Sequence, residues 1–134
     1  MRNAKGYRGY IGSRPYQGQR TPQHVQNLVI RDYCQRNNFT YLLSATEYHM
    51  PGCFIMLNEV MAELPEIEGV VLFSIFMLPN NRSKRHSLVR RILDAGATLH
   101  GALENMAITN EASFLCMEEI LSVNHIAIQG RVEI

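Results

Sequence analysis

The sequence predicts an α/β fold, a doubly wound and mainly parallel sheet of about four strands with helices on both faces. The hydrophobic period changes repeatedly along the chain between short β runs and helical stripes, in the order β-α-β-α-β-α-β-α. The run "GVVLFSI" at 69–75 is apolar without interruption, which is typical of a strand buried on both faces of a parallel sheet. Together these observations favour a flavodoxin-like arrangement.

The expected elements are joined by short loops, and several of their ends carry capping residues. Thr21 and Asn110 are placed to cap the first and fourth helices, Pro22 stands at a first helical position, and Gly96 ends the third helix. The tail at 124–134 is expected to form a short edge strand or a loose arm. The expected strands are 7–13, 39–44, 69–75 and 97–105, and the expected helices are 21–38, 53–64, 83–95 and 110–123.

Length and composition predict one globular domain over 1–134, with 1–6 and 124–134 as candidate loose arms. Hydrophobic residues make up 46% of the chain and charged residues 19%, which is typical of a folded protein. The sequence has no apolar run of about 18 residues and no signal-peptide pattern, so no membrane partner is expected. The three cysteines are widely spaced, which indicates reduced core thiols and a cytoplasmic location.

The polar residues that follow the expected strands are the candidates for a functional site. In a doubly wound sheet, ligands bind outside the carboxyl ends of the strands, where the strand order reverses. Four loops are expected at this edge of the sheet. The candidates for chemistry are Ser13, His24, Glu47 and His49. The candidates for ligand contact are Arg14, Arg20, Arg82 and Arg85 for an anion, and Gln17, Gln23, Tyr48, Asn80, Glu104 and Asn105 for other groups.

Each of the main candidates has a structural alternative. Ser13 is either a nucleophile or a turn residue whose side chain caps nearby N–H groups. Glu47 and His49 are either an acid–base pair or polar residues of an exposed loop. Arg82 and Arg85 fall on the apolar stripe of the third helix at its N-terminal turn, where free N–H groups and arginines favour an anion. The alternative for them is a solvated basic face.

No metal or cofactor is expected from the sequence. The five histidines are spread out without HxH or HExxH spacing, and neither a GxGxxG fingerprint nor a GxxxxGK[ST] loop is present. Two basic segments, 1–20 and 82–91, lie in a chain whose net charge is +1. That pattern indicates a local anionic ligand or a local interface, and it does not favour nucleic acid as a partner.

The stretch "YRGYIGSRPYQGQRTPQHVQNLVIRDYC" followed by "YLLSATEYHM" resembles the sporadic carbohydrate cluster family. Its members are small bacterial proteins encoded among surface-carbohydrate biosynthesis genes. The resemblance covers most of the chain and is strongest from Tyr7 to Met50. It implies a glycan-biosynthesis context and no catalytic residue.

Two hypotheses follow from that context. The first is a protein that binds or acts on a phosphorylated or nucleotide-linked sugar, a small anionic ligand, at the carboxyl edge of the sheet. Whether such a protein is an enzyme stays open. The second is a non-catalytic scaffold that forms a homo-oligomer or binds an enzyme of the pathway. For the scaffold, the apolar face "CFIML" of the second helix is either an interface or ordinary core.

A second resemblance is to the catalytic domain of serine recombinases, the resolvase group. In that family a serine follows the first strand and an arginine-x-x-arginine pair follows the third, as Ser13 and Arg82-Ser-Lys-Arg85 do here. The chain departs from the family because Ile11 stands where an arginine is usual, and because the arginine pair falls late. We expect the family's long dimerisation helix and DNA-binding domain to be absent. The resemblance implies shared architecture and, as a third hypothesis, a degenerate recombinase-like nucleic-acid module.

Overall fold

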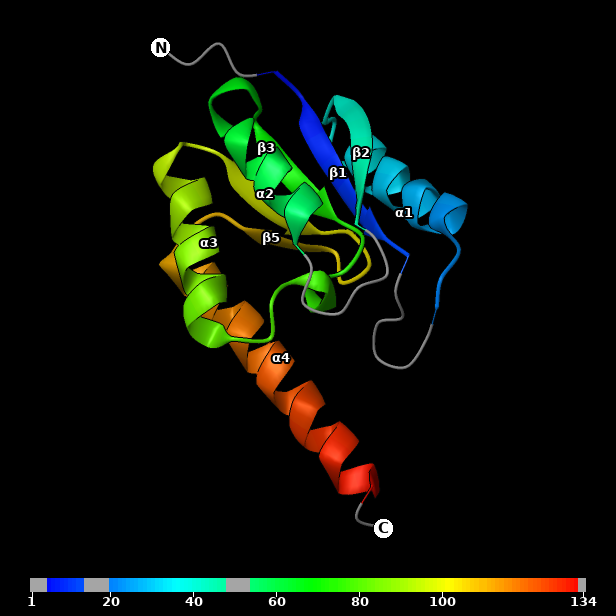
Figure 1. Cartoon of the computed structure of the whole chain (residues 1–134), viewed down its shortest axis with the longest axis vertical. Coiled ribbons are helices and arrows are strands. Elements are labelled where there is room, and N and C mark those ends of the chain that lie inside the picture. The colour runs from blue at the N-terminus through cyan, green and yellow to red at the C-terminus, as the bar shows by residue number, and fades with distance from the viewer. Residues whose placement is uncertain (1–4, 14–19, 48–53, 133–134) are drawn as a thin grey trace.

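The computed structural model describes residues 5–13, 20–47 and 54–132, with side chains as far as Val123. Over these residues the chain forms a five-stranded sheet of order β2-β1-β3-β4-β5 (Figure 1). The first four strands run parallel, and the short β5 pairs antiparallel with β4. The strands are β1 (Tyr7–Gly12), β2 (Tyr41–Glu47), β3 (Gly69–Leu72), β4 (Thr98–Gly101) and β5 (Met106–Ile108).

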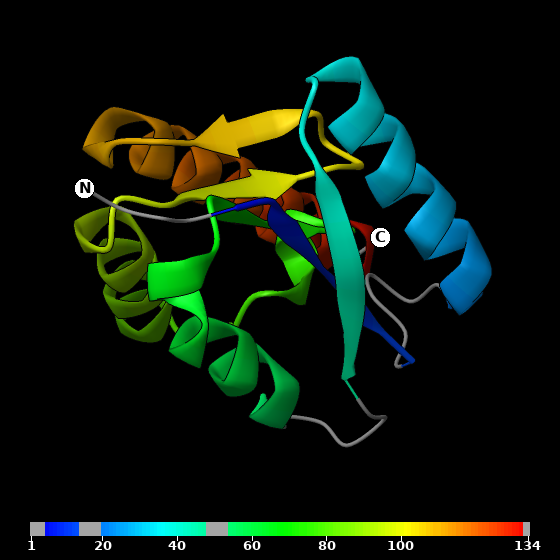
Figure 2. The same cartoon turned by 90° about the horizontal axis from the view of Figure 1, so that it is seen from above.

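The helices lie on both faces of this sheet, as the sequence predicts. Figure 2 shows α1 on one face and α2 and α3 on the other, which is the arrangement that right-handed crossovers produce. The chain passes from β1 outward to β2 and then back across β1 to β3, so the carboxyl ends of β1 and β3 flank the switch point. The helices are α1 (Gln23–Arg36), α2 (Ile55–Ala62), α3 (Arg82–Asp94) and α4 (Glu111–Val132), with 3-10 turns η1 (Leu64–Glu66) and η2 (Ile75–Met77).

Three local predictions are wrong. The predicted strand 97–105 ends at Gly101, and a turn with Asn105 at φ 53° leads into β5, which was not predicted. Strand β2 extends to Glu47, so this residue lies in a strand and not in a loop. Thr21 does not cap α1, because Pro22 occupies the N-cap position without a side-chain cap. The Thr21 carbonyl instead accepts a hydrogen bond from Gln26 Nε2 at 2.8 Å.

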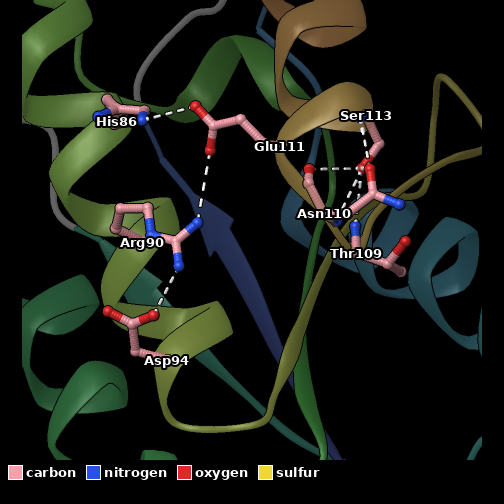
Figure 3. Close-up of polar contacts among 7 residues, drawn as sticks. All are labelled: His86, Arg90, Asp94, Thr109, Asn110, Glu111 and Ser113. Carbon is pink, nitrogen blue, oxygen red and sulfur yellow. Dashed lines mark hydrogen bonds and ion pairs between the residues drawn. The ribbon is translucent and has the colours of Figure 1, made fainter.

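The fourth helix is much longer than predicted. The tail was expected to be an edge strand or a loose arm, but it belongs to α4, which is helical through Val132. Its start has strong caps. Asn110 Oδ1 accepts the Ser113 N–H at 2.8 Å, and Ser113 Oγ accepts the N–H groups of Thr109 and Asn110 at 2.9 and 3.0 Å (Figure 3). No proline follows Asn110 to end the helix.

Two sets of ion pairs fix the first turns of α4 against α3. Glu111 accepts a hydrogen bond from His86 Nε2 at 2.9 Å and pairs with Arg90 at 3.5 Å (Figure 3). The hydrogen bond from His86 is the main cause that lowers the pKa of Glu111. About two turns further along, Glu118 accepts from Arg85 Nε and Nη2 at 2.6 and 2.7 Å. Arg82 Nε lies 3.5 Å from the same carboxylate. We call Arg82, Arg85 and Glu118 the arginine–glutamate cluster.

The Arg85–Glu118 pair is nearly enclosed, with 12% and 9% of the two side chains exposed. The remaining Arg85 donor, Nη1, reaches the Pro79 carbonyl at 3.0 Å. Both partners are therefore desolvated and depend on each other for their hydrogen bonds. Removing one partner of such a pair leaves an uncompensated charge.

We predict that Glu118→Ala lowers the free energy of unfolding by about 3–5 kcal/mol, because Arg85 is left buried without a carboxylate. Urea unfolding measures the change. Glu59→Ala is the matched control, since Glu59 is an exposed glutamate on α2, and it should change stability by less than about 0.5 kcal/mol. Equal effects of the two substitutions would contradict the structural role of the cluster.

A buried histidine joins α1 to β4. His100 is 3% exposed, and its Nδ1 and Nε2 lie 2.7 Å from the Tyr33 hydroxyl and 2.8 Å from Thr98 Oγ1. The rings of Tyr7 and Phe39 contact it edge-on, with centroids 5.6 and 5.0 Å away. Burial among these groups lowers the pKa of His100 to about 4, so the folded state favours the neutral ring.

We predict that His100 makes stability depend on pH between its unfolded pKa of 6.5 and its folded pKa of about 4. Its contribution is complete above the unfolded pKa and is lost as pH falls toward the folded one, for a total of about 3 kcal/mol. Urea unfolding at several pH values should show a flatter profile for His100→Gln than for wild type. His24→Gln, at an exposed position, should keep the wild-type profile. Parallel profiles for wild type and His100→Gln would contradict this assignment.

Candidate functional site

A buried glutamine holds the end of β1 in place at the switch point. Gln26 of α1 is fully buried, and its carboxamide pairs with Gly12, accepting from the N–H at 3.0 Å and donating to the carbonyl at 2.7 Å. These bonds fix where β1 ends and therefore where Ser13 lies. Sequence reasoning missed Gln26. Its signal was a polar residue four positions before the buried Ile30 of the same helix.

Ser13 follows β1 and is partly exposed. Its N–H donates to the Glu47 carbonyl at 3.1 Å, and its hydroxyl donates to the same carbonyl at 3.3 Å. Among the described residues no hydrogen bond joins Ser13 to His24, which is exposed in the first turn of α1. The predicted pair of nucleophile and base is therefore not assembled in this part of the chain, and the contacts of Ser13 are those of a turn residue.

Glu47 is fully buried at the end of β2 and caps the start of α2. Its Oε1 accepts from the Tyr10 hydroxyl at 2.7 Å and the Leu57 N–H at 3.3 Å, and its Oε2 accepts from the Met56 N–H at 3.0 Å. A carboxylate at a helix N-terminus satisfies unpaired N–H groups and interacts well with the helix dipole. The predicted acid–base partner of Glu47, His49, and the ligand-contact candidate Tyr48 lie outside the described residues.

Glu104 has a similar role at the end of β4. Its carboxylate accepts from Ser74 Oγ at 2.7 Å and from the Ile75 N–H at 2.9 Å, which fixes the start of η2. Gly101 permits this close approach, because a Cβ there would lie 2.8 Å from Glu104 Oε1 and 2.5 Å from Ile75 Cγ2. The loop after β3 thus becomes a rigid apolar turn, in which Ile75 and Met77 are fully buried.

The two arginines of α3 that were predicted to bind an anion are not joined to Ser13 within the described residues. Arg82 and Arg85 contact Glu118, as described above, and no hydrogen bond or ion pair joins them to Ser13 in the described part of the chain. Asn105 accepts a 3.4 Å hydrogen bond from Arg36 at the end of α1. The predicted residues Arg20, Gln23 and Asn80 are exposed, whereas Arg14 and Gln17 lie outside the described residues.

The described residues contain neither a candidate metal site nor a candidate membrane span. No group of three or more histidine, cysteine, aspartate or glutamate side chains is arranged there to hold a metal ion. No helix in the same ranges is both long enough and apolar enough to cross a membrane.

Comparisons with known proteins identify the architecture. No family model matches the chain, and no curated protein matches it. A resolvase family site-specific recombinase from Streptococcus pneumoniae matches with a TM-score of 0.64 and 12% identity, over 94% of this chain and 93% of that one. The N-terminal catalytic domain of TP901-1 integrase matches with a TM-score of 0.65 and 11% identity, over 91% of this chain and 97% of that one.

At such low identity these matches show the fold alone. They agree with the resemblance to serine recombinases, and they give no support to the resemblance to the sporadic carbohydrate cluster family. The described chain has the doubly wound, resolvase-like fold of recombinase catalytic domains.

Proposed function

We propose that this chain is a non-catalytic protein of the resolvase fold that works by associating with a second copy of itself through α4. The observation that carries the proposal is the apolar character of α4 on both of its sides. A second line of support is the carboxyl edge of the sheet, where Glu47, Glu104 and Arg85 are engaged in holding helices and turns.

The described part of the carboxyl edge offers little for strand exchange. The position two residues before Ser13, where the resemblance calls for an arginine, is Ile11, which is only 2% exposed. The loop after β3 presents the buried Ile75 and Met77 of η2 close to the end of the strand. The arginine pair comes later, in α3, and it neutralises Glu118. A phosphodiester bound near Ser13 would meet none of these arginines in their present contacts.

Over its described side chains, helix α4 has a second apolar face that the other described residues leave uncovered. Phe114, Met117 and Leu121 pack toward the core. On the other side, Leu115, Ile120 and Val123 are 46%, 40% and 66% exposed. Cys116 is also exposed there, against the expectation of a core thiol. These four residues recur at helical spacing, and we call them the outer stripe: Leu115, Cys116, Ile120 and Val123.

A helix that is apolar on both sides is expected where both sides are covered. Helix α4 has 22 residues, so it is about 33 Å long, and Figure 1 shows its C-terminal part extending beyond α3 and the sheet. A second α4 matches the outer stripe in apolar character, because it presents the same residues. Because the same surface serves both copies, two such helices form a closed, symmetric pair.

Two other apolar surfaces are weaker candidates. In the α2 face "CFIML" that the sequence suggested as an interface, Leu57 is in the core, Phe54 and Met56 pack against it, and Ile55 is the one exposed residue among those described. Leu43 is 76% exposed on the edge strand β2, but Leu42 and Leu43 oppose Arg8 alone in the β1 register, so the edge carries a bulge there. Bulges interrupt the hydrogen-bonding pattern that strand addition needs.

The sugar-ligand hypothesis stays a prediction. Its structural basis is the position of Ser13 at the switch point, together with Arg20 and Gln23, which are exposed near the start of α1. The glycan-biosynthesis context belongs to this hypothesis and comes only from the sequence resemblance. The uncovered face of α4 favours the self-associating protein over it.

The main test of the proposal replaces two residues of the outer stripe. We predict that the wild type forms dimers in sedimentation equilibrium and that Leu115→Lys/Ile120→Lys is monomeric, because the charges cannot be desolvated between two helices. Leu28→Lys is the matched control, since Leu28 is a leucine on α1 that is 60% exposed, and it should leave the dimer intact. Circular dichroism confirms that each variant is folded.

The native Cys116 thiol offers an independent readout. A short bismaleimide should link two copies of the wild type, and Cys116→Ser should reduce this cross-linking strongly. A wild type that stays monomeric at every concentration tested and forms no cross-link would contradict the proposal.

The absence of strand exchange is tested separately. We predict that wild type and Ser13→Ala leave supercoiled DNA equally uncut, because the cations near α3 neutralise Glu118. Gel electrophoresis of plasmid DNA after incubation measures cutting. Cleavage by the wild type that disappears in Ser13→Ala would show that Ser13 is a nucleophile and would overturn the non-catalytic assignment.

A further inference from the structure

We infer that Glu119 of one copy pairs with Arg82 of the other, and that this ion pair sets the register of the α4 interface. The inference rests on the proposed self-association. It adds the residues that decide how two apolar stripes align, since such stripes alone permit several registers.

Among the described side chains of α4, Glu119 is the acidic one that lies on the same side of the helix as the outer stripe. It lies four residues after Leu115 and four before Val123, so it shares their side of α4. Within the described residues it forms no hydrogen bond or ion pair, and it is exposed. If the outer stripe is buried against another helix, this carboxylate loses water and needs a cation from the partner.

Arg82 is the cation best placed to meet it. The oxygens of Glu118 already accept from Arg85 at 2.6 and 2.7 Å, so Arg82, whose Nε is 3.5 Å away, has only a secondary share of that carboxylate. The Arg82 side chain is 66% exposed. Two arginines share one glutamate in the cluster, which leaves one positive charge beside α4 without a full counter-charge.

The position of Arg82 also separates it from the other exposed cations of α3. Arg82 contacts α4 through Glu118, the residue directly before Glu119. Lys84 and Arg91 are seven positions apart on α3, are both exposed, and form no side-chain hydrogen bond or ion pair with α4 in the described residues. Next to α4, each copy therefore presents Arg82, a cation with only a shared counter-charge, and Glu119, an exposed acid without a hydrogen bond or ion pair among the described residues. In a two-fold dimer the pair would form twice, which doubles its effect on register.

Charge reversal tests this pair. We predict that Glu119→Lys and Arg82→Glu each weaken dimerisation about tenfold or more, and that the double variant recovers most of the affinity because the pair is restored with opposite sign. Arg82→Gln should weaken dimerisation without placing a second acid beside Glu118. Sedimentation equilibrium measures the dissociation constant, and thermal unfolding confirms that each variant is folded.

Two control variants, and the pattern of results among all the variants, distinguish a failure of this ion pair from a failure of the proposed function. Glu59→Lys and Lys84→Glu make the same changes of charge on exposed helical positions away from the stripe, and they should leave the dissociation constant unchanged. If neither charge reversal changes the dissociation constant, the ion pair is contradicted while self-association stands. The same holds if both single variants weaken the dimer and the double variant does not restore its affinity. A monomeric wild type would overturn both.

Discussion

The ion pair between Arg85 and Glu118 fixes the orientation of α4 against α3. It is short, bidentate and nearly enclosed, and through Pro79 it also holds the segment that joins η2 to α3. Because Glu118 must face α3, Phe114 and Met117 turn into the core. The same rotation leaves the outer stripe facing away from the sheet. The exposed apolar face of α4 is thus a consequence of where this one pair lies.

At the carboxyl edge of the sheet, two side-chain carboxylates of this chain bind backbone N–H groups that could otherwise bind an anionic ligand. The N–H groups at the start of α2 bind the Glu47 carboxylate, and those at the start of η2 bind the Glu104 carboxylate. Helix N-termini at this edge are the usual places for a phosphate. Here the two carboxylates occupy them, so residues that suggest acid–base chemistry in the sequence hold the scaffold together.

Periodicity predicted the alternating strands and helices, the switch point and the inward direction of Arg85, because these depend on local patterns. It could not predict β5, which has only three residues, or the partner of Arg85, which is 33 positions away. The length of α4 was missed for a physical reason. A helix that is apolar on two sides has no single hydrophobic stripe, so its sequence lacks the pattern that marks an amphipathic helix. Gln26 and the caps formed by Glu47 and Glu104 depend on tertiary contacts that no local pattern encodes.

The two arginines of α3 connect the edge of the sheet to the long helix. Their spacing is that of the recombinase pair, but they stand in α3 itself, beyond the rigid apolar turn of η2. From there the guanidinium of Arg85 binds the Glu118 carboxylate of α4 through two hydrogen bonds, and Arg82 Nε lies 3.5 Å from the same carboxylate. Arg85 is not available to a phosphodiester without leaving the nearly buried Glu118 without its main partner, which costs several kcal/mol. Holding α4 in place and binding DNA at the strand edge are therefore competing uses of the Arg85 side chain, and the contacts in this chain favour the first.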